Sequence, residues 1–448
     1  MTIRNDLSSA APRTSELQTY APVKVRWYLS KRNLWAAILG AHAVFFLGLS
    51  GTMLRGAVQG DLQIYRHWAF QGLVHGSWPG VDFAWVYPEV ALAPIVFAGL
   101  WGFGFYLFIW LCMISALNIA SFVALIGRRT SRSRMIAAWW WLAILVVLSP
   151  VALLRLDGLT APMVVIALVL LARWPLVTGA VLAAATWIKV WPAAIFLAIV
   201  ATSRNWRAVV AAGIITSAAV VAAILAMGAG DNISSFITMQ STRNLQLEAP
   251  IAGPWLWMSI ANQPGFLRFY GQTLETWEVT GPGSSFVAKL MTPLMALAVV
   301  AIMGLLWRAR KNGAPSQESL LVGALALATS MVVFNKVGSP QYMLWLVPIV
   351  VVGIALNTHE WRVPANLMMA ISIMTTMVFP IFYMPLVNGS RYAAILLTSR
   401  NVLLVILLGW TIMRLVALGR TVAARNDFPS RRTALLARLR VVATSPTT

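Results

Sequence analysis

One carboxylate, Asp61, lies just beyond an apolar run in a chain that has few acids. The 448 residues include 13 Asp and Glu, against 34 Lys and Arg. Residues 36–54 are apolar enough to cross a bilayer, and in the polar segment that follows Asp61 is accompanied by Tyr65, Arg66 and His67. A carboxylate at a membrane surface beside such groups can act as a general base on a substrate presented from the lipid. Asp61 is therefore our candidate catalytic residue.

Further charged residues fall in segments that we expect on the same side of the membrane as Asp61. The acids are Asp61, Asp82, Glu89, Asp157, Asp231, Glu248, Glu275 and Glu278, and the bases are Arg66, Arg155, Lys189, Arg243, Arg268, Lys336, Arg391 and Arg400. Cations in such a group can neutralise a departing phosphate, while a carboxylate takes the proton from an attacking hydroxyl. The alternative for each residue is a solvated loop charge with a casual partner.

Lys189 stands between two apolar runs, and Pro192 ends helical structure shortly after it. A lysine buried there needs an anion, whereas a lysine at a helix end can also extend its ammonium group to the membrane surface. Lys336 repeats the arrangement in a second turn, ahead of Pro340. For Arg155 and Asp157, two residues apart, the sequence suggests a simple ion pair with each other.

Metal and nucleotide motifs are weak in this chain. His67 and His75 share a loop with Asp61 and Asp82, but their spacing is not that of a metal site, so we expect no protein-held metal and no cofactor. The sequence contains no Walker loop, dinucleotide fingerprint or serine elbow. This argues against an ATP-driven pump and against a soluble nucleotide-sugar enzyme.

Composition places the chain among membrane proteins that cross the bilayer many times. Hydrophobic residues make up 59% of it and charged residues 10%, which a soluble domain does not tolerate. The net charge of +21 follows from the preference of Lys and Arg for cytoplasmic loops, and without a basic soluble domain we expect no binding to nucleic acid. The single cysteine, Cys112, excludes a disulfide within one chain.

The charged loops predict the organisation of the chain. We expect a basic cytoplasmic tail at 1–33, a transmembrane domain of about 11–12 helices at 34–418, and a basic cytoplasmic tail at 419–448, since the large basic clusters then share one side. Residues 90–100 are too few to cross, so they are expected to be re-entrant or interfacial. Two outer loops, 55–102 and 228–288, are long enough to carry helices and function.

Several short motifs follow one another along the chain: residues 60–65, residues 86–89 with Pro94, residues 188–192, residues 243–248, and residues 336–342 running into Trp345 and Pro348. They resemble those of the GT-C membrane glycosyltransferases, in particular the actinobacterial polyprenyl-phosphate-mannose-dependent enzymes of glycosyltransferase family 87 (DUF2029). The likeness covers about residues 34 to 418. It departs from the family at Tyr87-Pro88-Glu89, where Tyr-Pro-Pro is commoner, and at Asp157-Gly158, where Gly-Gln is often found.

The resemblance implies an all-α GT-C fold with extracytoplasmic loop helices, in the cytoplasmic (inner) membrane. It implies a donor sugar, mannose, on polyprenyl phosphate, and a glycolipid or polysaccharide acceptor on the outer face. Asp61 would deprotonate the acceptor hydroxyl, with inversion at the sugar. The implied phosphate ligands are Lys189, Lys336, Arg243, Arg391 and Arg400. The implied sugar or acceptor contacts are Tyr65, Arg66, His67, Trp85, Tyr87, Glu89, Asp157, Gln246, Glu248, Gln341 and Tyr342.

Two functions from other classes stay open at this point. A transporter or flippase of a lipid-linked sugar would use many of the same cations, but such proteins usually carry ionisable groups near the bilayer midplane, on broken helices of repeated halves. Here the charges gather in outer loops without a visible repeat, and Lys189 alone fits a transporter well. A scaffold protein of the envelope would not need carboxylates and cations collected on one side.

Overall fold

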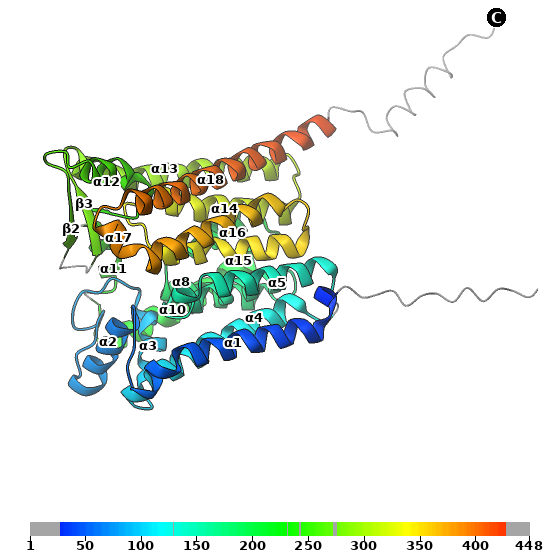
Figure 1. Ribbon diagram of the computed structural model, residues 1–448. Helices are drawn as coiled ribbons and strands as arrows, with labels where there is room; N and C mark the ends of the chain where they lie inside the picture. Colours follow the sequence, from blue (N-terminus) through cyan, green and yellow to red (C-terminus); the bar gives the residue numbers. More distant parts are fainter. Residues whose placement is uncertain (1–26, 129, 231, 242, 272–275, 427–448) are drawn as a thin grey trace, which may run out of the picture.

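The computed structural model describes residues 27–426, apart from 129, 231, 242 and 272–275 (Figure 1). The expected tails at 1–33 and 419–448 therefore fall largely outside the described residues, as do Asp231 and Glu275. The described chain begins and ends at the same end of a helical bundle. The helix α18 (Arg391–Asn426) continues past residue 418 at that end.

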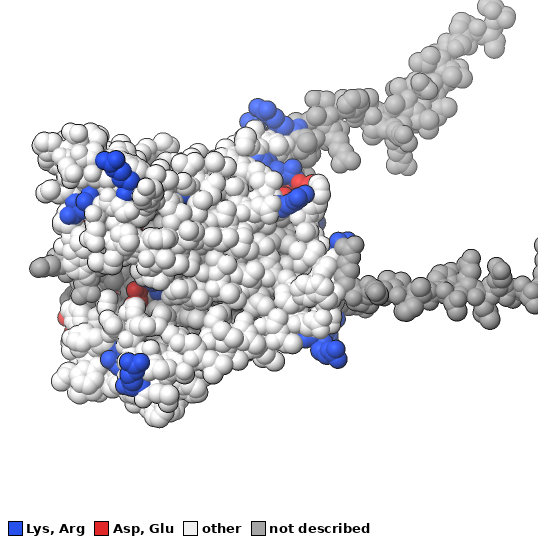
Figure 2. Space-filling view, in the orientation of Figure 1, with Lys and Arg blue, Asp and Glu red and all other residues white. Residues whose placement is uncertain are grey.

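Seven helical segments in the described part of the chain are long and apolar enough to cross a membrane. They contain α1 (Lys31–Leu54), α4 (Tyr106–Ile126), α10 (Trp206–Ala226), α13 (Ser284–Lys311), α14 (Ser316–Val333), α16 (Arg362–Thr376) with the π-helical turn η6 (Met377–Ile381), and α18. Figure 2 shows Lys and Arg at the two ends of the molecule and an uncharged band between them. The chain is thus a multi-pass membrane protein, as its composition predicted.

Shorter helices fill the interior between the long ones. These are α5 (Arg132–Val147), α6 (Ser149–Ala152), α7 (Asp157–Leu170), α8 (Pro175–Ile188), α9 (Ala193–Thr202) and α15 (Met343–Leu356). At 1.5 Å per residue a helix of 14 residues, such as α7 or α15, is about 21 Å long, against about 30 Å of hydrocarbon. Ten of the 14 residues of α7 and twelve of the 14 of α15 are buried, because these helices pack mainly against protein.

The end of the bundle opposite the described termini carries short helices (Figure 1). They are α2 (Leu62–His75), η2 (Glu89–Ala91), α3 (Leu92–Gly99), η3 (Phe103–Phe105), α11 (Ser235–Ser241), η4 (Pro250–Ala252), α12 (Gly253–Ile260) and α17 (Tyr383–Val387), with η1 (Trp27–Leu29) at the other end. Apart from η1, η3 and α17, they all lie in the two loops, 55–102 and 228–288, that were expected to carry helices. The segment expected to be re-entrant or interfacial forms η2 and α3 and packs against α2.

A small antiparallel sheet adds strands to a chain expected to be entirely helical. The strands β1 (Leu245–Gln246), β2 (Leu267–Gly271) and β3 (Thr276–Thr280) are arranged in the order β1-β3-β2. Leu245 and Leu247 face a buried apolar cluster with Val279 and with Leu386 of α17. The sheet therefore fixes the second outer loop onto the bundle, and it fixes the position of Gln246 and Glu248.

Candidate active site

Asp61 is the N-cap residue of α2, but its carboxylate does not cap that helix. Gly60 adopts φ +61°, a conformation that favours glycine, and turns the chain after α1. An Asp at a helix N-cap usually accepts from a first-turn N–H, whereas Asp61 makes no such bond. Instead its Oδ1 lies 3.1 Å from Arg155 Nη2, and 23% of the side chain is exposed. Asp61 is thus held by a cation and remains accessible.

Arg155 joins two segments that are remote from it in sequence. It lies between α6 and α7, its Nη2 pairs with Asp61, and its Nη1 donates to Gln341 Oε1. Its guanidinium carbon is 5.2 Å from the centre of the Phe379 ring. The expected ion pair between Arg155 and Asp157 is wrong, because each of the two residues pairs with a partner from another part of the fold.

Asp157 and Lys189 form a buried pair beside this contact. Asp157 Oδ2 lies 3.6 Å from Lys189 Nζ, and Oδ1 accepts from Trp345 Nε1 at 2.7 Å. The ammonium group also lies 4.2 Å from the centre of the Tyr87 ring. Burial acts to lower the pKa of Lys189, but Asp157 and its neighbours outweigh this effect and raise it, so Lys189 stays charged. It has the anionic partner that its sequence context called for.

Gly158 lets the segment with Arg155 and Asp157 approach α6 closely. A Cβ on Gly158 would lie 1.9 Å from the carbonyl oxygen of Ala152, a distance that no side chain can occupy. The first turn of α7 therefore rests directly on α6. This close packing puts Arg155 and Asp157 at one place near the end of the bundle opposite the described termini.

Three of the expected sugar contacts meet in an aromatic cluster. The ring centres of Tyr65 and Tyr87 are 6.2 Å apart, and those of Trp85 and Tyr87 are 5.4 Å apart. Trp68 packs against all three. Burial raises the pKa of Tyr65 well above its ordinary value, so its hydroxyl stays protonated. Since Lys189 lies over Tyr87, the aromatic cluster is continuous with the charged one.

Some buried polar atoms in this region have no hydrogen-bond partner within the described part of the chain. They include Trp85 Nε1, both carboxylate oxygens of Glu89, and Arg243 Nε. Glu89 and Trp85 are neighbours, since both lie within 3.5 Å of the place where a Cβ on Gly80 would stand. Burial raises the pKa of Glu89. Orphaned buried groups are rare in proteins, and a ligand is one explanation for them.

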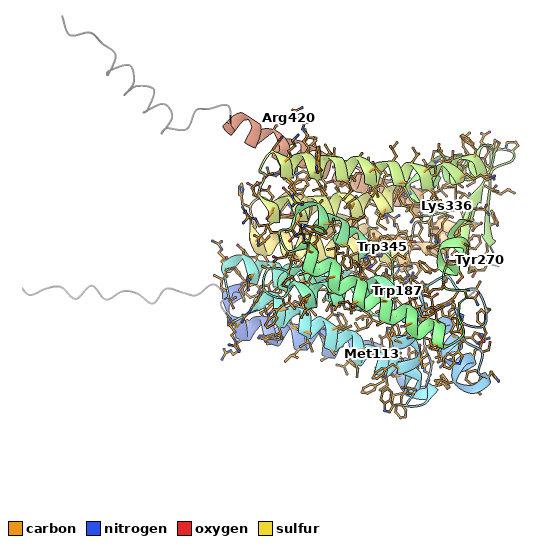
Figure 3. All side chains as sticks on the ribbon, turned by 180° about the vertical axis from the view of Figure 1, so that it is seen from behind. Met113, Trp187, Tyr270, Lys336, Trp345 and Arg420 are labelled. Atoms are coloured by element: carbon orange, nitrogen blue, oxygen red, sulfur yellow. The ribbon has the colours of Figure 1, made fainter. Side chains whose placement is uncertain are left out.

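A second cationic group lies at the same end, in the loops around the sheet. Burial lowers the pKa of Lys336, and the nearby positive charge of Arg243 lowers it further. Gln246 holds the two loops together, because its N–H donates to the Lys336 carbonyl and its Oε1 accepts from Gly338 N, both at 3.0 Å. Figure 3 shows Lys336 and Tyr270 toward this end and Trp345 deeper in the bundle. Tyr342 packs on Trp345 with ring centres 4.0 Å apart.

Glu248 and Arg400 form another buried pair. Arg400 Nη1 lies 3.6 Å from Glu248 Oε2, and Nη2 donates to the Glu248 carbonyl at 2.8 Å. Arg400 also donates twice to Asn401 Oδ1. Burial raises the pKa of Glu248 to about 7, although the nearby charge of Arg400 opposes the change. Arg400 thus fastens the loop to α18 through Nη2, and its Nε donates within α18, whereas Nη1 makes no hydrogen bond among the described residues.

Three of the expected residues lie apart from this cluster. Arg66 donates to the Gly56 carbonyl at 2.8 Å, and with His67 it lines a separate surface recess. Arg391 is exposed at the first residue of α18. Within the described residues, no group of three or more His, Cys, Asp and Glu side chains could hold a metal ion.

A cavity of about 510 Å³ opens at Asp61 and Arg155. Its walls are mainly apolar and come from the second half of α1, from the segment around α6, and from η6; they include Val44, Phe45, Leu49, Pro150, Leu153, Leu154, Phe379 and Pro380. Figure 2 shows acidic and basic atoms side by side in a recess at the end opposite the described termini. An apolar cavity that is also lined by a cation suits a lipid with an anionic head group. The accessible carboxylate beside the cation can take the proton from an attacking hydroxyl.

Arg155 and Trp345 are less distinctive in the sequence than Asp61 and Lys189. Arg155 was one of several outer cations, and Trp345 was one aromatic residue within a family motif. For Arg155 a signal was present, because an arginine flanked by leucines and next to a helix start needs an acceptor. For Trp345 we find no signal, since 21 tryptophans occur in the chain.

Comparison with known proteins identifies the family of this chain. The sequence model described as glycosyltransferase family 87 matches residues 85–330, which is more than half of the chain. A solved structure, that of ArnT from Cupriavidus metallidurans bound to undecaprenyl phosphate, is similar with a TM-score of 0.41 and 12% identity, over 88% of this chain and 78% of that one. No curated protein matches. The family match confirms the resemblance found in the motifs: this chain belongs to glycosyltransferase family 87.

Proposed function

We propose that this membrane glycosyltransferase takes a sugar, mannose, from polyprenyl phosphate and transfers it to a hydroxyl of a glycolipid or polysaccharide acceptor. The observation that carries the proposal is the cavity at Asp61 and Arg155, whose apolar walls suit a polyprenyl chain. Its charged end lies next to the cluster that contains Lys189 and Tyr87. A soluble nucleotide donor would have no use for such walls.

Asp61 is proposed as the general base. Its carboxylate takes the proton of the acceptor hydroxyl while the hydroxyl oxygen attacks the anomeric carbon of the donor sugar. The bond between that carbon and the phosphate oxygen breaks, its electrons stay on the phosphate, and polyprenyl phosphate leaves with one more negative charge. Attack from the face opposite the leaving group inverts the sugar. Asp61 suits this role because its side chain is partly exposed in the cavity.

The leaving phosphate is proposed to be neutralised by side-chain cations, without a resident metal or cofactor. Arg155 lines the cavity and contacts Asp61, so an entering phosphate competes with Asp61 for the same guanidinium. Lys189, Lys336 and Arg243 supply further positive charge nearby. Arg391 and Arg400, the other two expected ligands, are proposed as secondary, because one is peripheral and the other is bound to Glu248.

The sugar is proposed to bind against the aromatic cluster. Trp85 and Glu89 each present a buried polar atom without a partner in the described structure, as expected where a sugar hydroxyl completes the hydrogen bonds. Asp157 and Gln341 act through Lys189 and Arg155, whose positions they fix. The recess beside Arg66 and His67, outside the main cavity, is proposed for the acceptor.

We place this site on the outer face of the cytoplasmic membrane, with residues 34–418 as the transferase unit and the basic segments 1–33 and 419–448 in the cytoplasm. The support is the basic character of the end opposite the site, which includes Arg128, Arg134, Arg204 and Arg308. Loops rich in Lys and Arg remain on the cytoplasmic side during membrane insertion.

Sugar transfer by the purified protein in nanodiscs tests the proposal. The donor is radiolabelled polyprenyl-phosphate mannose, the acceptor source is a membrane lipid extract, and the variants are Asp61→Asn and Asp82→Asn. Asp82 is a matched control, because it is another acid of the first outer loop and its carboxylate only caps Trp78 N at 2.6 Å. We expect product from the unmutated protein and from Asp82→Asn, and a loss of about 10²- to 10⁴-fold for Asp61→Asn. Substantial transfer by Asp61→Asn would exclude Asp61 as the base.

A second donor series tests the sugar. If mannose is not transferred but another sugar on the same polyprenyl phosphate is, the donor class stands and mannose is wrong. If no polyprenyl-linked sugar is transferred while the protein moves the donor lipid between leaflets of a liposome, the transporter function is favoured instead.

A further inference from the structure

A second cavity lies at the end of the bundle that carries the described termini. It has a volume of about 330 Å³ and collects the last residues of α4, α7 and α15, the turn between α9 and α10, and the first turns of α5 and α14. The first cavity lies at the other end, where Asp157 starts α7 and Lys336 follows α14. The two cavities are therefore separated by the length of the bundle.

The short interior helices explain why this second cavity exists. α7 and α15 have 14 residues each and α9 has 10, so they reach about 21 Å and 15 Å. Their ends away from this cavity are held by the pair of Asp157 with Lys189 and by the contact of Gln341 with Arg155, which lines the first cavity. Because these ends are fixed, the opposite ends stop before the bundle does, and the longer helices α4 and α14 enclose the space that remains.

The floor of this space is apolar and its rim is polar and basic. Leu168, Leu320 and Val352 are buried residues of the floor. Arg134 and Arg204 stand on the rim, and no acid lines the cavity in the part of the chain that the structure describes. The pattern matches a molecule with an apolar part and an anionic head.

Two details keep the rim positive. Glu318, in the first turn of α14, is bonded to Arg414 Nη2 at 2.5 Å and so is neutralised from α18. Gly127 has φ +61°, and a Cβ there would lie 2.7 Å from Arg134 Nη1. The glycine thus leaves room for the Arg134 guanidinium against the end of α4. The first N–H groups of α14, which begins after Pro315 without a side-chain cap, add a further partial positive charge.

We propose that this second cavity binds an anionic membrane phospholipid, with the phosphate at Arg134 and Arg204 and the start of an acyl chain on the apolar floor. The occupant is a lipid and not free phosphate, because inorganic phosphate would leave the floor uncovered. The site lies away from the proposed chemistry and does not depend on it. A lipid there would tie together the free ends of α7, α9 and α15, whose other ends position Asp157, Lys189 and Gln341.

Lipid retention by the full chain in native mass spectrometry tests this site. The protein is reconstituted in nanodiscs of phosphatidylcholine, alone or mixed with phosphatidylglycerol, and the variants are Arg134→Gln/Arg204→Gln and the control Arg207→Gln/Arg308→Gln. The control removes two arginines from the same end that do not line the cavity. We expect at least a tenfold preference for phosphatidylglycerol in the unmutated and control proteins, and its loss in the first variant.

Equal retention by all three proteins would overturn the proposal, since general attraction to the basic end would then explain it. The same conclusion follows if inorganic phosphate raises the melting temperature as much as phosphatidylglycerol does. A measurement on the unmutated protein covers the case of a variant that does not fold. Photoactivatable phosphatidylglycerol should crosslink to the segments 168–172 and 203–205, and crosslinks confined to other segments would contradict the site.

Discussion

Replacing Asp61 by Asn is expected to tighten the binding of polyprenyl phosphate while it stops sugar transfer. In the structure Asp61 Oδ1 holds Arg155 Nη2 at 3.1 Å, and both residues line the cavity proposed for the lipid. A phosphate must therefore compete with Asp61 for Arg155. Asparagine keeps the shape of the side chain but not its charge, so it competes less and repels the phosphate less.

The size of the effect follows from the exposure of the pair. The side chains of Arg155 and Asp61 are 11% and 23% exposed, so solvent screens part of their attraction, and we assign the pair about 0.5–1 kcal/mol. Asp61→Asn should then bind the lipid about two- to fivefold more tightly. Arg155→Gln removes a hydrogen bond to a charged group, worth about 1.5–3 kcal/mol, and should bind it about 10- to 160-fold more weakly.

Affinity for a short-chain polyprenyl phosphate, measured by calorimetry on the detergent-solubilised protein, checks both numbers. Asp82→Asn is the control and should bind like the unmutated protein. The double variant Asp61→Asn/Arg155→Gln separates the two causes, because the part of the gain that depends on Arg155 disappears in it. Unchanged or weaker binding by Asp61→Asn, or unchanged binding by Arg155→Gln, would refute competition for the guanidinium.

Three further predictions concern stability. Asp157→Ala leaves Lys189 buried without its anion and should cost about 3–5 kcal/mol; the melting temperature should fall, and Asp157→Ala/Lys189→Met should recover part of the loss. Gly158→Ala puts a Cβ 1.9 Å from the Ala152 carbonyl oxygen and should lower both the melting temperature and transfer. Burial raises the pKa of Glu248 from 4.5 to about 7, so the folded state binds more protons than the unfolded state in this window and stability should fall as pH rises through it. Melting temperatures on either side of the window should differ less in Glu248→Gln.

The sequence allowed the membrane class, the loop helices and the position of Asp61 to be predicted, because each depends on local composition. An uninterrupted apolar run predicts a span wherever it occurs, and an acid that directly follows such a run needs an explanation. The small sheet could not be predicted in this way. Its strand β1 has two residues and pairs with β3 more than 30 residues later. A strand this short shows no alternation of apolar and polar residues from which it could be predicted.

The charged pairs of the site show a different limit. Lys189 was expected to need an anion, which is a statement about the cost of burying a charge. That the anion is Asp157, while Arg155 goes to Asp61, depends on how α2, α7 and α8 pack together. Nearness in sequence favoured the pairing of Arg155 with Asp157, and the turn that rests on α6 through Gly158 directs the two side chains to different partners.

The shortness of the interior helices connects these observations. Non-helical backbone is tolerated at membrane depth only where it is buried in protein or lines a cavity, so apolar runs too short to cross must end at such places. Asp157 starts α7, Lys189 follows α8, and Gln341 precedes α15, so these helix ends supply the buried pair of Asp157 with Lys189 and the Gln341 acceptor of Arg155, which lines the first cavity. The other ends of α7, α9 and α15 border the second cavity. The interior helices that are too short to cross therefore position polar residues beside the first cavity at one end and border the second cavity at the other.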